Sequence, residues 1–458
     1  MGKNVLIALL AAALVVVTVA RWPGPPPAAP AIVREDGELQ GLLASVAADP
    51  ALAGAPFGFC LVDAQGEVLA GWDEGMPMIP ASTLKTLTVA TALEVLGPDF
   101  RFETVLEVQG EPGEPRVGHV VLRGGGDPTL SMEVLEAWAD ELAAAGVVRI
   151  HGVVADGSCF PAVTAGDFWG WGDVGNGYGS PVAGLNLGHN RFTVRLRPGA
   201  TVGSPASFLG AEPEVPGVEW RVDVATAEPG SGDGVMIYGG PDATRIRVTG
   251  TVPAGAGVFA VEGAVPDPAR FAAFHFDRLL AEREIARAVG PGVDPTIRGK
   301  AWSTHSSAPL SAIVRHLHRV SDNHEAECLF RMLGARTGRD PAELIRSHWS
   351  GRGLDLGACR IVDGSGLSRA DTITPLALAR LQALAARGPA GEVYLASLPE
   401  SGGGSVRMKG GAMSAVRSWC GRVTGADGRE RYFAMIFNHY PDGDAVSRAR
   451  DRLLAALR

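Results

Sequence analysis

Ser82 and Lys85 lie three residues apart in the segment PASTLK, directly after a proline. Positions i and i+3 share one face of a helix, so the ammonium group of Lys85 can reach the hydroxyl of Ser82. A serine hydroxyl is a weak nucleophile until a base takes its proton, and a lysine whose pKa is lowered by burial can be that base. The pair therefore indicates nucleophilic catalysis by Ser82, with a chance Ser-x-x-Lys on a surface helix as the alternative.

A second candidate is the segment VSDNH, which lies between two helical patterns and holds Ser321 and Asn323. On such a turn both side chains can point into one cleft, where the hydroxyl relays a proton and the amide holds a substrate carbonyl. Serine and asparagine are also favoured N-caps, so either residue can instead cap the helix that follows.

A third candidate lies near the C-terminus, where Lys409 is followed by Gly410, Gly411 and Ala412. Two glycines after a lysine let a substrate backbone approach an edge strand closely. A glycine hairpin is the alternative interpretation.

No metal or cofactor site is expected from the remaining polar residues. His316, His318, His324 and Glu327 look superficially like metal ligands, but the first two histidines point to different helix faces and the segment HEAEC is not H-E-x-x-H. We therefore expect solvated or capping roles for these side chains. The five cysteines have no CxxC spacing, and either one or two disulfides or buried free thiols are compatible with them.

Composition limits the class of protein and its partners. The 458 residues, 46% of them apolar and 61 of them glycine, indicate a globular chain of mixed α and β structure with room for two or three domains. The net charge is −9 and no long basic run occurs, which argues against nucleic acid as a partner.

The N-terminal segment, residues 1–34, is expected to direct export. An apolar run follows Lys3 and ends before a proline-rich spacer, WPGPPPAAPA. The small residues at 18–20 are compatible with signal-peptide cleavage, and an uncleaved membrane anchor is the alternative. Either interpretation predicts a location in the periplasm or cell envelope.

Hydrophobic periodicity predicts the elements that must position the three candidate segments. A strand hairpin is expected at 57–70, and a largely buried helix at 82–96 carries Ser82 in its first turn. Further helices and strands are expected at 310–319, 323–334, 374–386, 416–423, 432–438 and 445–457. The stretch from 102 to 297 has short valine-rich runs and, apart from a helix at 132–145, indicates an inserted β-rich region.

In this order, the three segments resemble the active-site motifs of penicillin-recognising serine enzymes. Other segments sharpen the resemblance: 122–130 (LRGGGDPTL), Tyr178 followed by Ser-Pro at 180–181, Asn190, 363–369 (DGSGLSR) and 397–399 (SLP). Together they resemble the D-alanyl-D-alanine carboxypeptidase/endopeptidase of the penicillin-binding protein 4 type, a DacB-like family of serine peptidases. The similarity covers residues 43–457.

The resemblance implies a role for each candidate residue. Ser82 is the acylated nucleophile, Lys85 its base, and Ser321 with Asn323 the second motif. Lys409 is the cation near the substrate carboxylate, and the backbone N–H groups of Ser82 and Ala412 form the oxyanion hole.

The resemblance also implies an α+β fold. A transpeptidase-like, serine β-lactamase-like domain with a five-stranded antiparallel sheet and covering helices is expected at 35–102 and 297–458. The inserted β-rich region is expected at 103–296.

One departure from the family pattern bears on substrate recognition. The family usually has threonine where this chain has Gly410, and commonly a hydroxyl-bearing residue where it has Ala412. The expected function is a serine D-Ala-D-Ala carboxypeptidase/endopeptidase that acts on peptidoglycan stem peptides through acyl-Ser82 and is acylated by β-lactams. The alternatives are a catalytically impaired relative that binds wall peptides or envelope partners, and a serine β-lactamase.

Overall fold

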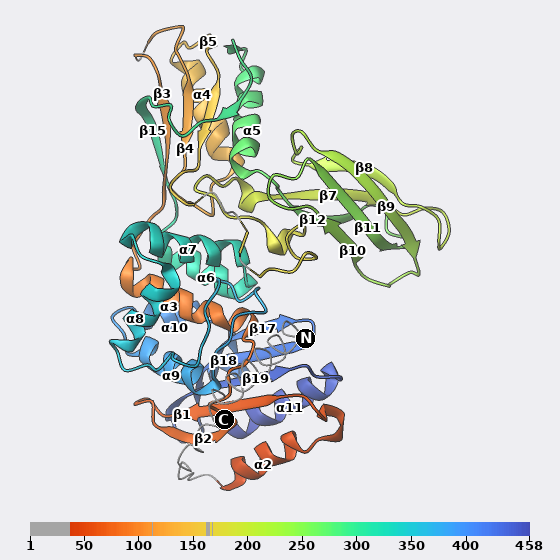
Figure 1. Ribbon diagram of the computed structural model, residues 1–458, viewed down its shortest axis with the longest axis vertical. Coiled ribbons are helices and arrows are strands. Elements are labelled where there is room, and N and C mark those ends of the chain that lie inside the picture. Colours follow the sequence, from red (N-terminus) through yellow and green to blue (C-terminus); the bar gives the residue numbers. More distant parts are fainter. Residues whose placement is uncertain (1–36, 112, 162–164, 167) are drawn as a thin grey trace, which may run out of the picture. The chain divides into compact units, whose positions relative to one another are not determined.

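The computed structural model describes residues 37–111, 113–161, 165–166 and 168–458 (Figure 1). The expected export segment, residues 1–34, lies outside the described residues. Among the helices that are described, none is long and apolar enough to cross a membrane.

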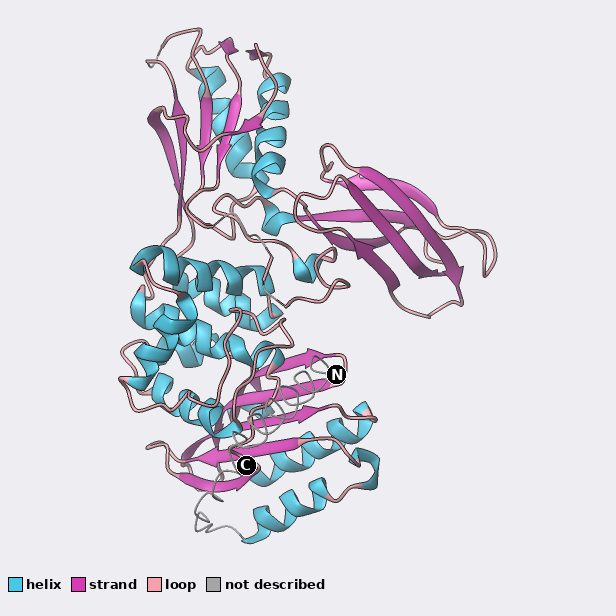
Figure 2. Cartoon of the chain, viewed as in Figure 1, coloured by secondary structure: helices cyan, strands magenta, loops and turns pink. Residues whose placement is uncertain are grey.

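A six-stranded antiparallel sheet contains the third candidate segment, and its strand β2 precedes the first (Figure 2). Its strand order is β16-β17-β18-β19-β1-β2. The strands are β1 (Phe57–Val62), β2 (Val68–Trp72), β16 (Glu400–Ser401), β17 (Val406–Met413), β18 (Val416–Thr424) and β19 (Glu430–Asn438). The resemblance implied five strands, and the sixth is the two-residue β16 at the edge beside β17.

Helices cover both faces of this sheet, and its strand β1 is apolar throughout. All six residues of β1 are buried, which is typical of a strand that lacks a solvent face. One face packs against α2 (Gly37–Ala47) and α11 (Gly443–Leu457). The other face packs against α9 (Pro375–Ala386) and the helices beyond it.

The helical layer on the second face positions the nucleophile and the second motif. Its helices are α3 (Lys85–Val95), α6 (Leu310–Val320), α7 (Asn323–Thr337), α8 (Pro341–Ser350) and α10 (Gly391–Ser397). The predicted helix at 82–96 begins with a 3₁₀ turn, Ala81–Leu84, which leads directly into α3. Ser82 therefore lies in the first turn of this buried element, as its sequence pattern predicts.

The stretch between β2 and α6 contains four further sheets. A five-stranded sheet has the order β14-β6-β4-β3-β15, two three-stranded sheets have the orders β12-β7-β8 and β10-β11-β9, and β13 pairs with β5. The strands are β3 (Glu103–Val108), β4 (Val120–Arg123), β5 (Arg149–Ile150), β6 (Val153–Asp156), β7 (Arg191–Arg197), β8 (Ser207–Glu212), β9 (Glu219–Ala227), β10 (Gly234–Tyr238), β11 (Arg245–Pro253), β12 (Phe259–Ala264), β13 (Ala286–Arg287), β14 (Gly292–Val293) and β15 (Lys300–Ser306). Two helices, α4 (Met132–Ala144) and α5 (Pro268–Glu282), share a separate hydrophobic core with these strands.

The division of the chain into a discontinuous catalytic domain and an insertion stays a proposal. The pairing of β15 with β3 joins residues 300–306 to the sheet of the inserted region. This pairing favours a second boundary after residue 306 rather than at 296.

All five cysteines are free thiols, four of them buried. The sequence was compatible with either one or two disulfides or buried free thiols, and the described structure has free thiols.

Candidate active site

Lys85 lies within hydrogen-bonding distance of the Ser82 hydroxyl. The distance from Lys85 Nζ to Ser82 Oγ is 2.8 Å, and the same nitrogen donates to Asn323 Oδ1 at 2.5 Å and to the Ser365 carbonyl oxygen at 2.7 Å. The lysine side chain is completely buried. The 3₁₀ turn and the start of α3 thus place the Ser82 hydroxyl and the Lys85 amine on one face, and Asn323 and Ser365, which are distant in sequence, hold the amine in place.

Burial, together with the nearby cation Lys409, lowers the pKa of Lys85 to about 7, although Asp363, Asp322 and Glu327 act in the opposite direction. At neutral pH a large fraction of the amine is therefore unprotonated. In that form the Ser82 O–H donates its hydrogen bond to the Nζ lone pair, which is the arrangement required for general-base catalysis.

Ser321 and Asn323 lie at the junction of α6 and α7, and neither caps α7. Asp322 is the N-cap, since its carboxylate accepts a hydrogen bond from Glu325 N at 2.9 Å. Ser321 ends α6 in the left-handed conformation, with φ 61°. The capping alternative is therefore wrong for these two side chains, which are left available to other partners.

The partners of the second motif are the two active-site lysines and the inserted region. Ser321 Oγ accepts a hydrogen bond from Lys409 Nζ at 2.8 Å. Asn323 accepts from Lys85 and donates through Nδ2 to the Tyr178 carbonyl oxygen at 2.8 Å. The second motif thus joins the first motif, the third motif and the inserted region.

The third segment lies within β17 and is not a hairpin. Gly410 pairs with Trp419, Gly411 with Ser418 and Ala412 with Arg417 in regular antiparallel register. The glycine-hairpin alternative is therefore wrong. Lys409 is 3% exposed, and burial lowers its pKa to about 8.

At Gly411 the strand β17 passes close to the backbone of Ser82. A Cβ atom at this position would lie 2.8 Å from Ser82 N and 2.9 Å from the Pro80 carbonyl oxygen, and would also overlap Ser418 Oγ. Such short contacts mean that a side chain here would force either the strand or the turn to move. The absence of a Cβ at 411 therefore lets the strand run beside the Ser82 amide.

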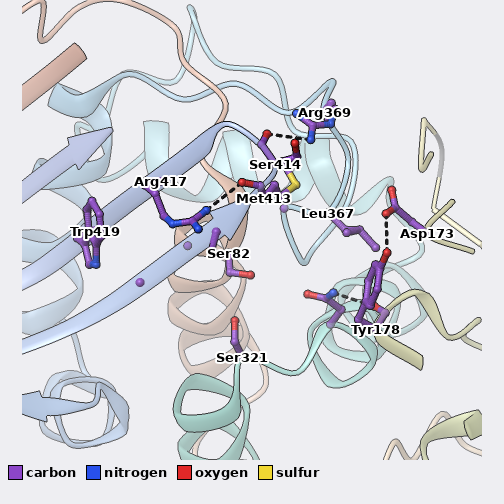
Figure 3. A pocket seen from close by; sticks show the side chains of 15 residues that line it. Ser82, Asp173, Tyr178, Ser321, Leu367, Arg369, Met413, Ser414, Arg417 and Trp419 are labelled. Atoms are coloured by element: carbon purple, nitrogen blue, oxygen red, sulfur yellow. Dashed lines mark hydrogen bonds between the residues drawn. The ribbon is translucent and has the colours of Figure 1, made fainter. Parts of the chain in front are cut away.

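A cleft of about 740 Å³ opens over Ser82 (Figure 3). Its lining includes six of the eight predicted site residues, and Lys85 and Lys409 lie buried behind them. The lining consists of Ser82, Asp173, Tyr178, Ser321, Asn323, Gly366, Leu367, Arg369, Gly410, Gly411, Ala412, Met413, Ser414, Arg417 and Trp419. The sequence did not single out Asp173, Met413, Ser414, Arg417 or Trp419, because nothing local indicates that their segments meet at Ser82.

A loop that is fixed by hydrogen bonds to Asp363 provides one of the acceptors of the Lys85 amine. Asp363 Oδ1 accepts hydrogen bonds from Ser365 N and Gly366 N, at 3.0 and 2.6 Å, and this turns the Ser365 carbonyl toward Lys85. Gly366 has φ +75° and lies directly against the Ala81 carbonyl oxygen. The segment DGSGLSR, noted in the sequence only for its resemblance, thus shapes the base's surroundings.

Two of the histidines near the site and Glu327 are buried rather than solvated. His318, His324 and Glu327 are 1%, 0% and 2% exposed, so the expected solvated or capping role is wrong for these three, whereas the His316 side chain is 42% exposed. His318 Nδ1 lies 2.8 Å from Ser397 Oγ, and His324 Nε2 lies 3.1 Å from Asn190 Nδ2. The reason is that His318 lies on the buried face of α6 and that His324 begins the largely buried run of α7. No group of residues suited to hold a metal ion occurs in the described ranges.

We expect acylation to follow a bell-shaped pH profile. Below about pH 7 Lys85 is protonated and cannot take the serine proton, so kcat/KM should fall about tenfold per pH unit. Above about pH 8 Lys409 loses the charge that attracts an anionic substrate, so the rate should fall again. Because the two lysines interact, the apparent values belong to the pair. Measuring acylation by a fluorescent penicillin from pH 5 to 10 tests this, and a flat profile would exclude Lys85 as the base.

A buried lysine that shares a hydrogen bond with a serine, beside an antiparallel sheet covered by helices, defines a serine peptidase of the transpeptidase-like class. Comparison with known proteins agrees. The model of the D-Ala-D-Ala carboxypeptidase 3 (S13) family matches residues 39–457. The chain therefore belongs to this family, and the predicted serine-type D-Ala-D-Ala carboxypeptidase is confirmed by that membership.

Individual relatives support the same assignment. The D-alanyl-D-alanine carboxypeptidase of Actinomadura sp. (strain R39) is 33% identical, with 94% of this chain and 87% of the relative aligned. The carboxypeptidase DacB of Haemophilus influenzae is 27% identical over 84% of this chain and 86% of its own length. The crystal structure of penicillin-binding protein 4 from H. influenzae matches with a TM-score of 0.80 at 23% identity, covering 92% of this chain and 99% of that one. The α+β, transpeptidase-like fold is confirmed.

Proposed function

We propose that this carboxypeptidase cleaves the terminal or cross-linking D-alanyl bond of peptidoglycan stem peptides through an acyl-Ser82 intermediate, and that β-lactams acylate the same serine. The observation that carries the proposal is the 2.8 Å contact between Ser82 Oγ and the buried Lys85 amine at the bottom of a peptide-sized cleft. A structure of the H. influenzae relative in complex with a β-lactam supports the second part.

The proposed reaction uses the contacts of the site in order. Lys85 Nζ takes the Ser82 proton while Oγ attacks the carbonyl carbon, and the N–H groups of Ser82 and Ala412 stabilise the oxyanion. The proton returns from the lysine, or through Ser321, to the leaving D-alanine nitrogen. Water then attacks the acyl-enzyme with the same base, which releases the shortened peptide and restores Ser82.

Lys409 and Ser321 are proposed to hold the carboxylate of the leaving D-alanine. They already contact each other at 2.8 Å, and Lys409 Nζ also donates to the Gly410 carbonyl oxygen at 2.5 Å. The buried Lys409 nitrogen lies directly behind Ser321 and Gly410, which line the cleft, so its charge acts on an anionic terminus bound there.

Incubation of the purified protein with a fluorescent penicillin, followed by mass analysis of the labelled peptide, tests the proposal. We expect a stable adduct on Ser82 and release of D-alanine from a D-Ala-D-Ala peptide. A folded protein that forms no adduct would indicate the catalytically impaired binding protein. Rapid release of hydrolysed antibiotic would indicate the β-lactamase.

Introducing a hydroxyl at position 410 should improve recognition of the substrate carboxylate. Gly410 lines the cleft and does not have a left-handed φ, and a Cβ there would lie 3.5 Å from Trp419, which is ordinary contact. The backbone therefore accepts Gly410→Thr. A hydrogen bond to a charged group is worth about 1.5–3 kcal/mol, so kcat/KM should rise roughly ten- to 150-fold.

The measurement for Gly410→Thr pairs the acylation rate with the melting temperature, and Gly410→Ala is the matched control that adds a Cβ without a hydroxyl. An ordered water that already bridges to the carboxylate would reduce the gain. An unchanged melting temperature with no gain in rate would show that carboxylate recognition here does not use a hydroxyl at 410.

We also propose that the chain acts outside the cytoplasm, in the periplasm or cell envelope. The apolar run and proline-rich spacer of residues 1–34 support this, as does membership of a family that acts on the cell wall. A fusion of residues 1–35 to a reporter that is active only after export should be active. A reporter retained in the cytoplasm would rule the location out.

A further inference from the structure

A second hollow lies on the inserted region, against the sheet β10-β11-β9. It is an open groove of about 640 Å³, lined by Trp171, Asp223, Tyr238, Gly239, Gly240, Ala243, Arg245, Arg247, Thr249 and Gly250. None of these residues takes part in the chemistry proposed above. The groove is therefore a candidate for a separate binding role.

Two aromatic rings form one wall of the groove. The side chain of Trp171 is 68% exposed, and its ring stacks on Tyr238 with the centroids 6.4 Å apart and the planes at 22°. A tryptophan is rarely left so exposed, because its surface is largely apolar. Gly240 has no side chain that could cover the edge of the Trp171 ring. A Cβ atom at this position would lie 4.0 Å from that ring. The wall is thus a flat apolar surface open to a ligand.

Polar side chains form the rest of the groove, and the positive charges among them are paired with negative charges. Arg245, Arg247 and Thr249 alternate along β11, so they share its outer face, and Thr249 pairs with Asp223 of β9. Arg247 lies 3.6 Å from Asp223, and Arg245 lies 3.0 Å from Glu219. Because each arginine has a carboxylate partner, the surface favours a neutral polar ligand over a polyanion.

The groove and the catalytic cleft share one segment of chain. Trp171 lines the groove, and Asp173, two residues further on, lines the cleft. Asn176 ties this segment to β10, donating to the Ile237 carbonyl oxygen at 3.3 Å and accepting from Ile237 N at 3.1 Å. The Tyr178 carbonyl oxygen is held by Asn323 of the second motif at 2.8 Å. A ligand bound in the cleft beside Asp173 can therefore continue along this segment toward Trp171.

We propose that the groove beside Trp171 and Tyr238 is a saccharide subsite, which binds an N-acetylated amino sugar of the glycan to which the stem peptide is attached. A pyranose ring presents an apolar face of C–H groups and a rim of hydroxyl and amide groups. The aromatic wall matches the face, and the arginine, aspartate and threonine side chains match the rim. The inference rests on the proposed function, because it names the glycan part of the same substrate.

Two measurements test the subsite. The first is titration of the full chain with a tetramer of N-acetylglucosamine, followed by calorimetry, for which we expect saturable binding that Trp171→Ala removes. The second compares kcat/KM for a stem peptide that carries its disaccharide with kcat/KM for the same peptide without sugar. A stacking contact of about 0.5–1.5 kcal/mol corresponds to a preference of roughly two- to tenfold for the glycan-linked peptide.

Variants separate the subsite from general effects on the fold. Trp171→Ala should remove the preference for the glycan-linked peptide and leave the rate on the free peptide unchanged, whereas Trp171→Phe should retain part of the preference. The control is Leu209→Ala on β8, which removes another exposed apolar side chain of the inserted region, 41% exposed, and should change neither rate.

The outcomes distinguish this inference from the proposed function. If the free peptide is hydrolysed but the tetramer does not bind and the sugar brings no preference, the saccharide subsite is overturned and the peptidase function stands. If neither peptide is hydrolysed, the peptidase function fails, and binding of the tetramer still decides on the subsite. Equal binding by wild type and Trp171→Ala would also overturn it.

Discussion

Ser82→Ala should abolish acylation by penicillin and by D-Ala-D-Ala peptides, because it removes the only atom proposed to form the covalent bond. The substitution deletes one oxygen that accepts from Lys85 at 2.8 Å, so little change in the fold is expected. Labelling with a fluorescent penicillin, read by gel and mass analysis, is the measurement. Ser414→Ala is the matched control, since it removes a different hydroxyl from the lining of the same cleft and should keep the label. Normal labelling of Ser82→Ala would contradict the proposal that Ser82 is the nucleophile.

Lys85→Ala should slow acylation by about 10²- to 10⁴-fold while leaving Ser82 in place, since this is the usual contribution of a general base. The melting temperature shows whether the loss is catalytic or structural, because Asn323 Oδ1 and the Ser365 carbonyl lose a buried donor. Lys300→Ala, at an exposed lysine, is the control and should have no effect. A rate within a few fold of wild type would mean that another group takes the proton.

Gly411→Ala should reduce acylation about 10²-fold or more. The added methyl group would lie 2.8 Å from Ser82 N, so either β17 or the turn that carries the nucleophile has to move. Displacements of about 1 Å at reacting groups cost about 10²-fold in rate. The expected loss is greater than for any other single added methyl group on this strand.

The neighbouring glycine provides the control for that prediction. Gly410→Ala adds the same methyl group at a position where the nearest atoms, in Trp419, lie 3.5 Å away. Its melting temperature and acylation rate should stay near those of the wild type. If both variants behaved alike, the close approach of β17 to Ser82 would not be the cause of the loss.

Local patterns were sufficient to predict the contact between Ser82 and Lys85 and the elements that carry them. The i and i+3 spacing of Ser82 and Lys85 needs only one helical turn to become a contact, and the structure has it at 2.8 Å. The hairpin at 57–70, the helices near 310 and 323 and the last two strands follow from periodicity in the same way. These features depend on neighbours in the sequence, so a single chain reveals them.

Features that depend on distant partners were harder to predict. Asp173 faces the cleft because its segment is fixed by contacts to Asn323 and β10, and no periodicity encodes them. The burial of His318 and His324 depends on how α6 and α7 pack. The helix α5 was missed although its local signals are good, since Asp267 caps it and Pro268 occupies its first turn. The frequent glycines and prolines around it suggested strands instead.

The central pairing of the main sheet joins nearly opposite ends of the described chain. Strand β1, which leads to the nucleophile, lies between β2 and β19, and Phe57 pairs with Phe437. During synthesis β1 can pair with β2 early, but it can pair with β19 only after the last strand has been made. This pairing is a long-range contact of the kind that slows folding. A chain that has not yet been completed contains Ser82 but cannot form the site around it. We therefore expect peptidase activity to require β19, and a truncated product lacking this strand should be inert toward the cell wall.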